Sequence, residues 1–173
     1  MQIKNKIRLY FLGTIVTVLV MRFLDKPLKN EIATNGIVSF ELAGSLQNSI
    51  DILNSWGVNA KLYAGISLGF DYLFMLMYSL LLYTLVKYLT SKFSNTSAIK
   101  LGNLIAIFMF IAGVLDAIEN YSLIQLYLGN LDQIFSTVAY YSATLKFSII
   151  GIGITYILIC YFYFFRVAFT KNN

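Results

Sequence analysis

The stretch LGNLIAIFMFIAGVLDAIENYSLIQLYL, residues 101–128, is apolar enough to cross a lipid bilayer as one helix. A bilayer core requires about 20 consecutive apolar residues in helical form, and this stretch is longer than that. It nevertheless carries Asp116, Glu119 and Asn120 within five residues. A soluble helix would turn such groups toward water, whereas a membrane helix has no water to offer. We therefore ask what these polar side chains face.

The composition of the whole chain also indicates a membrane environment. Of its 173 residues, 58% are hydrophobic and 12% are charged, whereas soluble domains have about 45–50% and 25%. The chain contains no histidine and a single cysteine, Cys160, which excludes histidine-based catalytic triads and an intramolecular disulfide. Motifs for metal ligation, phosphate binding or a nucleophile are absent from the sequence. We therefore expect no cofactor, no metal and no catalytic residue.

Three further segments are apolar over similar lengths, and together with residues 101–128 they predict four membrane spans. These segments cover about residues 7–24, 62–89 and 138–169. Each approaches or exceeds the length that a helix needs to cross the bilayer. The predicted fold class is therefore all-α. We expect an integral membrane four-helix bundle that forms a single membrane domain over residues 1–173 and has the lipid bilayer as its first partner.

The first predicted span also has features of a signal peptide. Lys4, Lys6 and Arg8 precede its apolar core, as in the basic region of a secretory signal. The core ends in MRFL, residues 21–24, which offers no cleavage site made of small residues. We interpret the segment as a retained span.

Charged residues outside the spans predict the direction in which the helices cross. The amino-terminal segment, the loop between the second and third spans, and the carboxyl-terminal segment contain lysine or arginine but no acid. The acids outside the spans all lie in the other two loops. Because basic residues mark the cytoplasmic side, we expect both termini in the cytoplasm of a multi-pass protein of the cell membrane. Topology then explains the net charge of +5, and no nucleic-acid partner is expected.

The loop of residues 25–61 is the only long segment outside the predicted spans. Within it, three apolar residues recur at helical spacing, namely Leu46, Ile50 and Leu53. This spacing predicts a short amphipathic helix on the outer surface of the membrane, with Trp56 at the level of the lipid head groups. We interpret this helix as a lid over the ends of the spans. A gate, or a docking element for a partner, is the alternative.

Counting residues along the spans places several polar side chains at one depth. With a rise of 1.5 Å per residue, Asp71, Glu119 and Lys146 lie roughly 12–14 Å inside the outer boundary of their spans. Asp116 lies one turn deeper, and its spacing to Glu119 and Asn120 puts all three on one face. Charged groups inside a bilayer usually face the bundle interior and pair. Lys146 is therefore expected to pair with Asp71 or Glu119.

These residues define a predicted polar site that opens to the outer side of the membrane. Its candidate members for binding a ligand or a proton are Asp71, Asp116, Glu119, Asn120, Lys146 and Tyr78. Three acids face one lysine, so at least one carboxyl group is expected to hold a proton. Tyr78 is interpreted either as a hydroxyl donor to the acids or as a packed aromatic.

Two interpretations of this site stay open. As a staple, its ion pairs and hydrogen bonds fix which helix faces which, each contributing about 0.6–2 kcal/mol. As a pocket, it binds or transports a small molecule, a lipid or a proton, and the excess of acid favours this second interpretation. A small apolar or lipid-like ligand is then expected. The alternatives are an accessory subunit that binds a membrane-protein partner or a second copy of itself, and, third, a lipid-modifying enzyme.

Two stretches resemble segments of small bacterial four-span membrane proteins: FDYLFMLMYSLLLY, residues 70–83, and AGVLDAIENYSL, residues 112–123. In those proteins an acid in the second span accompanies an L-D-x-x-E-N stretch in the third. The resemblance implies a membrane bundle in the bacterial inner membrane, and it implies no activity. In architecture alone the chain is also similar to the sterol isomerase and sigma-2 receptor group, which keeps buried acids around a lipid-like ligand. Since this chain lacks the histidine of the isomerases, isomerase activity is not implied.

Overall fold

A computed structural model describes the backbone of residues 2–171 and the side chains of residues 2–167. Its elements are α1 (Ile3–Asp25), the short 3-10 helix η1 (Lys26–Leu28), α2 (Ile37–Glu41), α3 (Leu46–Ser55), α4 (Val58–Thr90), α5 (Thr96–Tyr127) and α6 (Gln133–Lys171). Every regular element in this described part of the chain is helical. The predicted all-α fold is confirmed.

Four stretches of helix are long and apolar enough to cross a membrane: Ile3–Leu28, Val58–Thr90, Thr96–Tyr127 and Gln133–Val167. The chain is thus a multi-pass membrane protein. Each stretch begins a few residues before the predicted span, because a helix continues past its apolar part until its end is capped. At the start of α5, the side chain of Asn95 accepts hydrogen bonds from the backbone N–H groups of Ser97 and Ala98.

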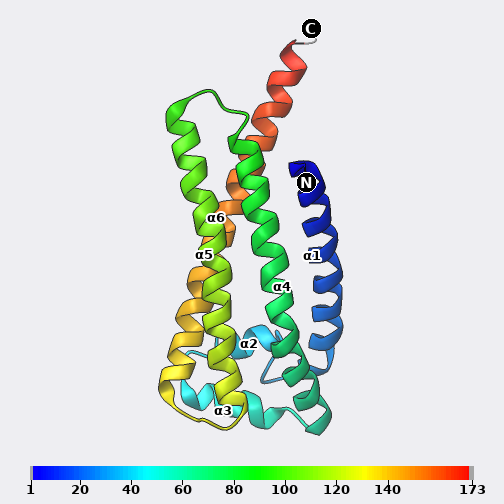
Figure 1. Cartoon of the computed structure of the whole chain (residues 1–173). Coiled ribbons are helices and arrows are strands. Elements are labelled where there is room, and N and C mark those ends of the chain that lie inside the picture. Colours follow the sequence, from blue (N-terminus) through cyan, green and yellow to red (C-terminus); the bar gives the residue numbers. More distant parts are fainter. Residues whose placement is uncertain (1, 172–173) are drawn as a thin grey trace.

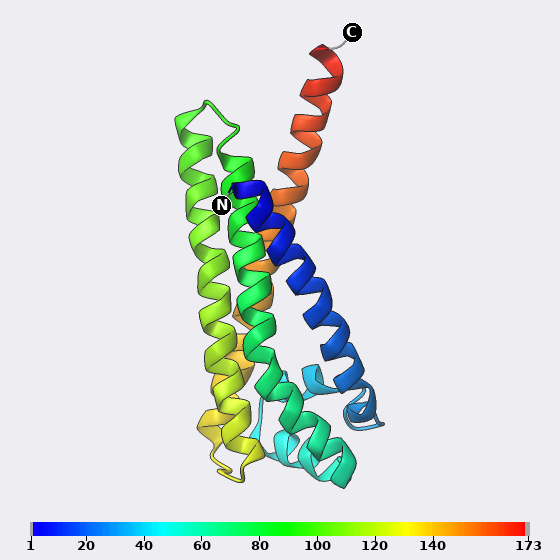
Figure 2. The same cartoon turned by 45° about the vertical axis from the view of Figure 1, so that its right-hand side comes forward.

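The four long helices run alternately up and down (Figure 1), so that both ends of the described chain lie at the same end of the bundle. The α4–α5 loop also lies at this end, which we call the terminal end. Helix α1 packs along α4, α4 along α5, and α5 along α6. Figure 2 shows that α6 extends past the α4–α5 loop. The middle of the bundle is therefore formed by α4 and α5, with α1 and α6 as flanking helices.

Residues 26–57 fold over the opposite end of the bundle and form a cap (Figure 1). Side chains of the cap and of the long helices share one apolar core, in which Leu28 and Phe40 pack with Leu68 and Leu123. Helix α3 begins at Ser45, whose hydroxyl accepts a hydrogen bond from the N–H of Asn48. The predicted amphipathic helix in this loop is confirmed, and it lies over the helix ends.

Trp56 lies in the core of the cap, so it does not contact lipid head groups as the predicted anchor would. Its side chain is only 2% exposed, and its ring packs edge-on against Phe40 with the centroids 5.6 Å apart. The indole N–H donates a hydrogen bond to the backbone carbonyl of Leu28 at 2.9 Å. Because the polar tip of the ring has this partner, the whole side chain can be buried.

The start of α2 is fixed by the end of α1. A carboxylate oxygen of Asp25 accepts a hydrogen bond from the backbone N–H of Ile37 at 2.7 Å. Gly36, just before this helix, has a φ of +59°, and a side chain there would collide with the Asp25 carboxylate. Only glycine fits these two conditions at this position. The geometry holds α2 against the bundle and determines where Glu41, its last residue, points.

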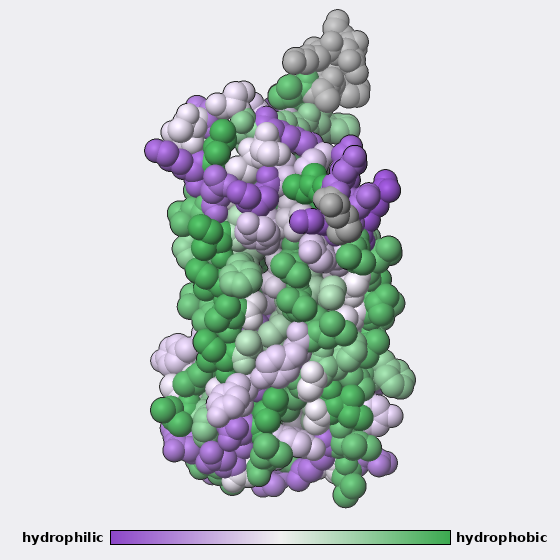
Figure 3. All heavy atoms as spheres, in the orientation of Figure 1, coloured by the Kyte–Doolittle hydropathy of each residue, from purple (hydrophilic) through white to green (hydrophobic). Residues whose placement is uncertain are grey.

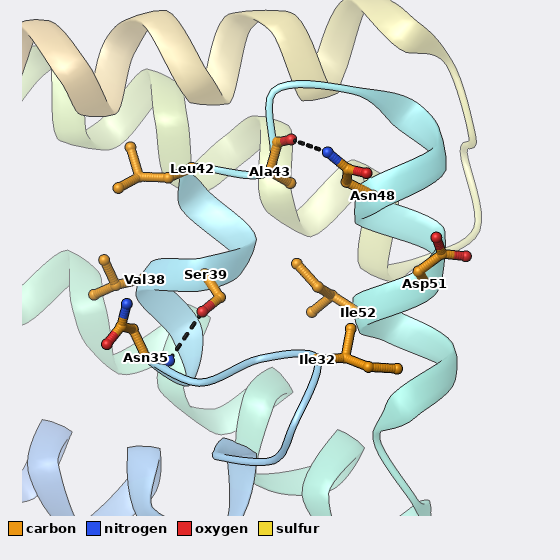
Figure 4. Close-up of a pocket in the computed structure, with 9 residues that line it drawn as sticks. All are labelled: Ile32, Asn35, Val38, Ser39, Leu42, Ala43, Asn48, Asp51 and Ile52. Atoms are coloured by element: carbon orange, nitrogen blue, oxygen red, sulfur yellow. Dashed lines mark hydrogen bonds between the residues drawn. The ribbon is translucent and has the colours of Figure 1, made fainter.

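A hollow of about 340 Å³ lies on the cap between α2 and α3 (Figure 4). Its polar side chains bond within the cap: the Asn48 amide donates to the Ala43 carbonyl at 2.8 Å. The Ser39 hydroxyl accepts from the backbone N–H of Asn35 at 3.0 Å. These hydrogen bonds stabilise the connections between the short helices.

Candidate functional site

Lys146 on α6 is the centre of a buried ionic cluster. Its ammonium nitrogen Nζ lies 2.6 Å from Oδ1 of Asp116 and 2.8 Å from Oε1 of Glu119. All three residues are at most 5% exposed. Asp116 and Glu119 are three residues apart on α5, so both carboxylates face α6, the neighbouring helix. The structure thus brings together three of the residues singled out in the sequence.

Glu41 joins this cluster from the cap. It was not among the predicted site residues, because it lies outside the spans and no helical spacing relates it to the other acids. Its Oε2 atom lies 3.7 Å from Nζ of Lys146. The available signal was that Glu41 is the only charged residue in IVSFEL, residues 37–42. Ile37 and Phe40, on the same side of this short helix, are buried in the core of the cap. Because these two side chains are buried, the end of the helix that holds Glu41 lies against the bundle.

The carboxyl group of Glu41 is largely withdrawn from water: its side chain is 13% exposed, and its Oε2 atom is buried. Burial raises the pKa of Glu41 above its ordinary value, and the positive charge of Lys146 opposes this effect without cancelling it. Oε2 of Glu41 and Oε2 of Glu119 are both buried and have no hydrogen-bond partner among the described side chains. A proton held between these two carboxyl groups would satisfy both oxygens.

Tyr78 on α4 is a hydroxyl donor to the cluster. Its hydroxyl group donates a hydrogen bond to Oδ2 of Asp116 at 2.7 Å, and the side chain is 7% exposed. Both oxygens of Asp116 therefore have partners, one from α4 and one from α6. This arrangement connects three long helices through a single carboxylate.

Asn120 makes its hydrogen bond on a different side of α5. Its amide donates to the backbone carbonyl of Leu68 on α4 at 2.6 Å, and the side chain is 2% exposed. The structure places Asn120 between α4 and α5 as a fastening of these two helices.

Of the two partners predicted for Lys146, Glu119 forms the ion pair and Asp71 does not. Asp71 instead lines a cavity beside the cluster. The cavity has a volume of about 210 Å³, and it is bordered by α1, α2, α4 and α6. Its lining residues are Met21, Arg22, Asp25, Ile37, Val38, Glu41, Asp71, Phe74, Lys146 and Phe147. Among the described side chains, none forms a hydrogen bond or an ion pair with the carboxyl group of Asp71.

The site carries more acids than bases, although Arg22, an exposed residue, also lines the cavity. The four carboxyl groups of Glu41, Asp71, Asp116 and Glu119 lie around or beside the one ammonium group of Lys146. Four ionised carboxylates would exceed the two cations, Lys146 and Arg22, and a buried charge without a partner is expensive. The arrangement can therefore hold a proton or accept a further cation on the Asp71 side.

The described side chains include no group of three or more acids, cysteines or histidines arranged to hold a metal ion. Comparisons of the chain with protein-family models, with curated proteins and with solved structures find no match. The resemblances noted in the sequence therefore stay predictions.

Proposed function

We propose that this protein binds a small amphiphilic molecule with a cationic head group in the cavity beside Lys146. The observation that carries the proposal is the carboxyl group of Asp71, which lies in the wall of this cavity and makes no hydrogen bond or close ion pair with the described side chains, although Lys146 acts on it electrostatically. Glu41 lines the same cavity. Two carboxyl groups are thus presented to a ligand from two different elements, α4 and the cap.

The charge of the head group follows from the surroundings of the cavity. The ammonium group of Lys146 already has two close partners, Asp116 and Glu119. An anionic head group would meet an excess of acids, whereas an ammonium group carries up to three N–H donors that carboxylates accept. Arg22 lines the cavity as well, and the carboxyl groups of Glu41, Asp71, Asp116 and Glu119 still outnumber the two cations, Arg22 and Lys146. A cationic ligand supplies positive charge that offsets this excess.

The apolar part of the ligand follows from the other walls. Met21, Phe74 and Phe147 line the cavity, and Phe147 is 43% exposed on the membrane-spanning helix α6. Helix α1 packs against α4 and not along α6, so the cavity lies between two helices that face lipid. A cavity of about 210 Å³ is smaller than typical pockets for whole drug-sized ligands. It suits a head group whose alkyl chain stays in the bilayer.

Asp71→Asn is expected to weaken the binding of dodecylamine about tenfold or more, because the variant loses one charge-assisted hydrogen bond. Binding is measured by calorimetry on the protein in lipid nanodiscs, with empty nanodiscs as the baseline. Asp132→Asn is the matched control, since it removes an acid from the same end of the molecule and keeps an oxygen that can cap α6 at Ile134. Equal affinities of the wild type and Asp71→Asn would contradict the proposal.

The same measurement has an expected pH dependence. Because the pKa of Glu41 is raised, its carboxyl group is protonated over a wider pH range than an ordinary glutamic acid, and the proton competes with the cationic ligand. The affinity for dodecylamine should therefore rise as the pH is raised through the pKa of Glu41, and fall as the pH is lowered. In the variant Glu41→Gln this component of the pH dependence should be absent.

The proposed orientation places the cap and the cavity on the outer side of the cell membrane, with both termini in the cytoplasm. The distribution of basic residues supports it. Single cysteines at Ser94, in the α4–α5 loop, and at Asn54, on α3, test this orientation in a Cys160→Ala background. An impermeant maleimide added to intact cells should label only the cysteine at position 54, and permeabilised cells should show both. Labelling of position 94 alone in intact cells would show the opposite orientation, with both termini outside the cell.

If dodecylamine does not bind, the alternative is favoured: the protein is a structural or accessory subunit, and the buried polar site only organises its helices. The contacts of Lys146 with Asp116 and Glu119 support that alternative for this part of the cluster, because those side chains are mutually satisfied and buried. Asp71 is the member of the site that a staple does not explain.

A further inference from the structure

A second surface, separate from the Lys146 cluster, runs along α4, beside α5 in the middle of the bundle and beside α1 at the terminal end. Three hollows follow one another on it. The first, of about 290 Å³, is lined by Tyr72, Met75, Leu76, Ser79, Phe110, Gly113, Val114 and Ala117. The second, of about 390 Å³, lies toward the terminal end and is lined by Leu80, Tyr83, Ile107 and Phe110. The third, of about 240 Å³, is lined by Ile3, Lys6, Tyr83, Thr84 and Lys87.

Shared residues make these hollows one groove, which we call the α4–α5 groove. Phe110 borders the first and second hollows, and Tyr83 borders the second and third. The groove is concave because the two helices approach closely at its floor: a Cβ atom on Gly113 would lie 2.9 Å from the side chain of Ser79. Figure 3 shows this face of the molecule as an apolar band bounded by hydrophilic residues at both ends.

The groove ends at two lysines. Lys6 on α1 and Lys87 on α4 line its last hollow, and Nζ of Lys87 donates one hydrogen bond to the side chain of Asn103 at 2.7 Å. An ammonium group has three N–H donors, so Lys87 keeps two for a ligand. The sequence contains no Asp or Glu before residue 25 or between residues 72 and 115. The positive charge at this end of the groove is therefore not balanced by acids of these helices.

The length of the groove fits one leaflet of a bilayer. Leu76 and Lys87 are eleven residues apart on α4, which corresponds to roughly 16 Å along the helix. Half of a bilayer core about 30 Å thick has nearly this depth. An acyl chain that begins at the lysines would thus reach the first hollow near the middle of the membrane.

We infer that the α4–α5 groove binds an anionic phospholipid from the leaflet at the terminal end. The phosphate lies between Lys6 and Lys87, and one acyl chain follows Tyr83, Ile107 and Phe110. The paired lysines favour an anionic lipid over a zwitterionic one, because the net negative head group gains two cationic partners. This site is independent of the cavity proposed above, which lies near the capped end and presents carboxyl groups.

Native mass spectrometry of the protein released from nanodiscs tests the inference. The nanodiscs contain equal amounts of phosphatidylglycerol and phosphatidylcholine, and both lipids have the same acyl chains. The wild type should retain phosphatidylglycerol preferentially, and Lys6→Gln with Lys87→Gln should reduce this preference about tenfold. Lys4→Gln with Lys100→Gln is the matched control, because both lysines are exposed at the same end and line none of the hollows. The control should keep the preference.

A second variant tests the apolar part of the groove. Ile107 is 55% exposed, so Ile107→Trp should fold while filling the second hollow, and it should lower retention of both phospholipids severalfold. The inference is overturned if the preference survives Lys6→Gln with Lys87→Gln, or if the control pair loses it equally. It is also overturned if the wild type retains no lipid and forms a dimer that Ile107→Trp dissociates, since the groove would then hold a helix.

Discussion

Replacement of Lys146 with methionine is expected to destabilise the protein by about 3–5 kcal/mol at neutral pH, because it removes one partner of a buried ion pair. Without the ammonium group, Asp116 and Glu119 lose contacts of 2.6 and 2.8 Å. Their carboxyl groups must then be buried as uncompensated charges or take up protons.

The measurement is thermal unfolding in a mild detergent at neutral pH. Lys61→Met is the matched control, because Lys61 is an exposed lysine at the start of α4 and its side chain lies outside the cluster. The control should melt within a degree or two of the wild type, as expected for a surface substitution. If Lys146→Met melted like the wild type at neutral pH, the ionic cluster would not contribute to stability as described.

Replacement of Trp56 with alanine is expected to cost about 3–5 kcal/mol in the cap, which is typical of a large buried aromatic. The variant removes the packing of the ring against Phe40 and the hydrogen bond to the Leu28 carbonyl. Trp56→Phe keeps most of the packing and loses the hydrogen bond, so it should cost less, about 1–3 kcal/mol. The order of the two variants separates the two contributions.

Hydrogen exchange of the backbone amides of residues 26–57 measures the loss of stability of the cap itself. In Trp56→Ala these residues should exchange faster while the amides in the middle of α5 stay protected, since the cap opens before the bundle. Val58→Ala, at a position that is 88% exposed, should exchange like the wild type. Unchanged exchange of the cap in Trp56→Ala would show that the ring does not hold it in place.

The four spans and the depth of the ionic cluster could be predicted from the sequence, for one physical reason. Each span is a continuous helix with a constant rise per residue, so counting from its end gives the depth of Asp116, Glu119 and Lys146. Charged groups at that depth require partners. Depth and charge alone left Asp71 and Glu119 as alternative partners of Lys146, and the structure pairs Lys146 with Glu119 and also with Asp116, one turn deeper.

The positions of side chains in the cap could not be predicted by counting residues along a helix. The positions of Glu41 and Trp56 depend on how the chain turns back after α1, which the Asp25 carboxylate and the positive φ of Gly36 determine. Neither contact has a sequence periodicity that reveals it. The sequence accordingly predicts a loop acid at position 41 and an anchor at the membrane surface at Trp56, whereas both side chains pack within the protein.

The different directions of Glu119 and Asn120 have a simple geometrical origin. Consecutive helical residues are about 100° apart, so Glu119 and Asn120 point to opposite sides of the direction of Asp116. Glu119 therefore reaches Lys146 on α6, and Asn120 reaches Leu68 on α4. The face predicted from their spacing is thus divided between two helices: Asp116 contacts both α4 and α6, Glu119 contacts α6, and Asn120 contacts α4.

Photolabelling tests the central claim, that the cavity holds a cationic amphiphile at Asp71, most directly. An alkylamine with a photoreactive group in its chain is added to the protein in nanodiscs, irradiated, and mapped by peptide mass spectrometry. We expect the label on residues around Met21, Phe74 and Phe147, removed by excess dodecylamine and lost in Asp71→Asn but not in Asp132→Asn. Label spread over the lipid-facing surface, unaffected by dodecylamine and by Asp71→Asn, would contradict the claim.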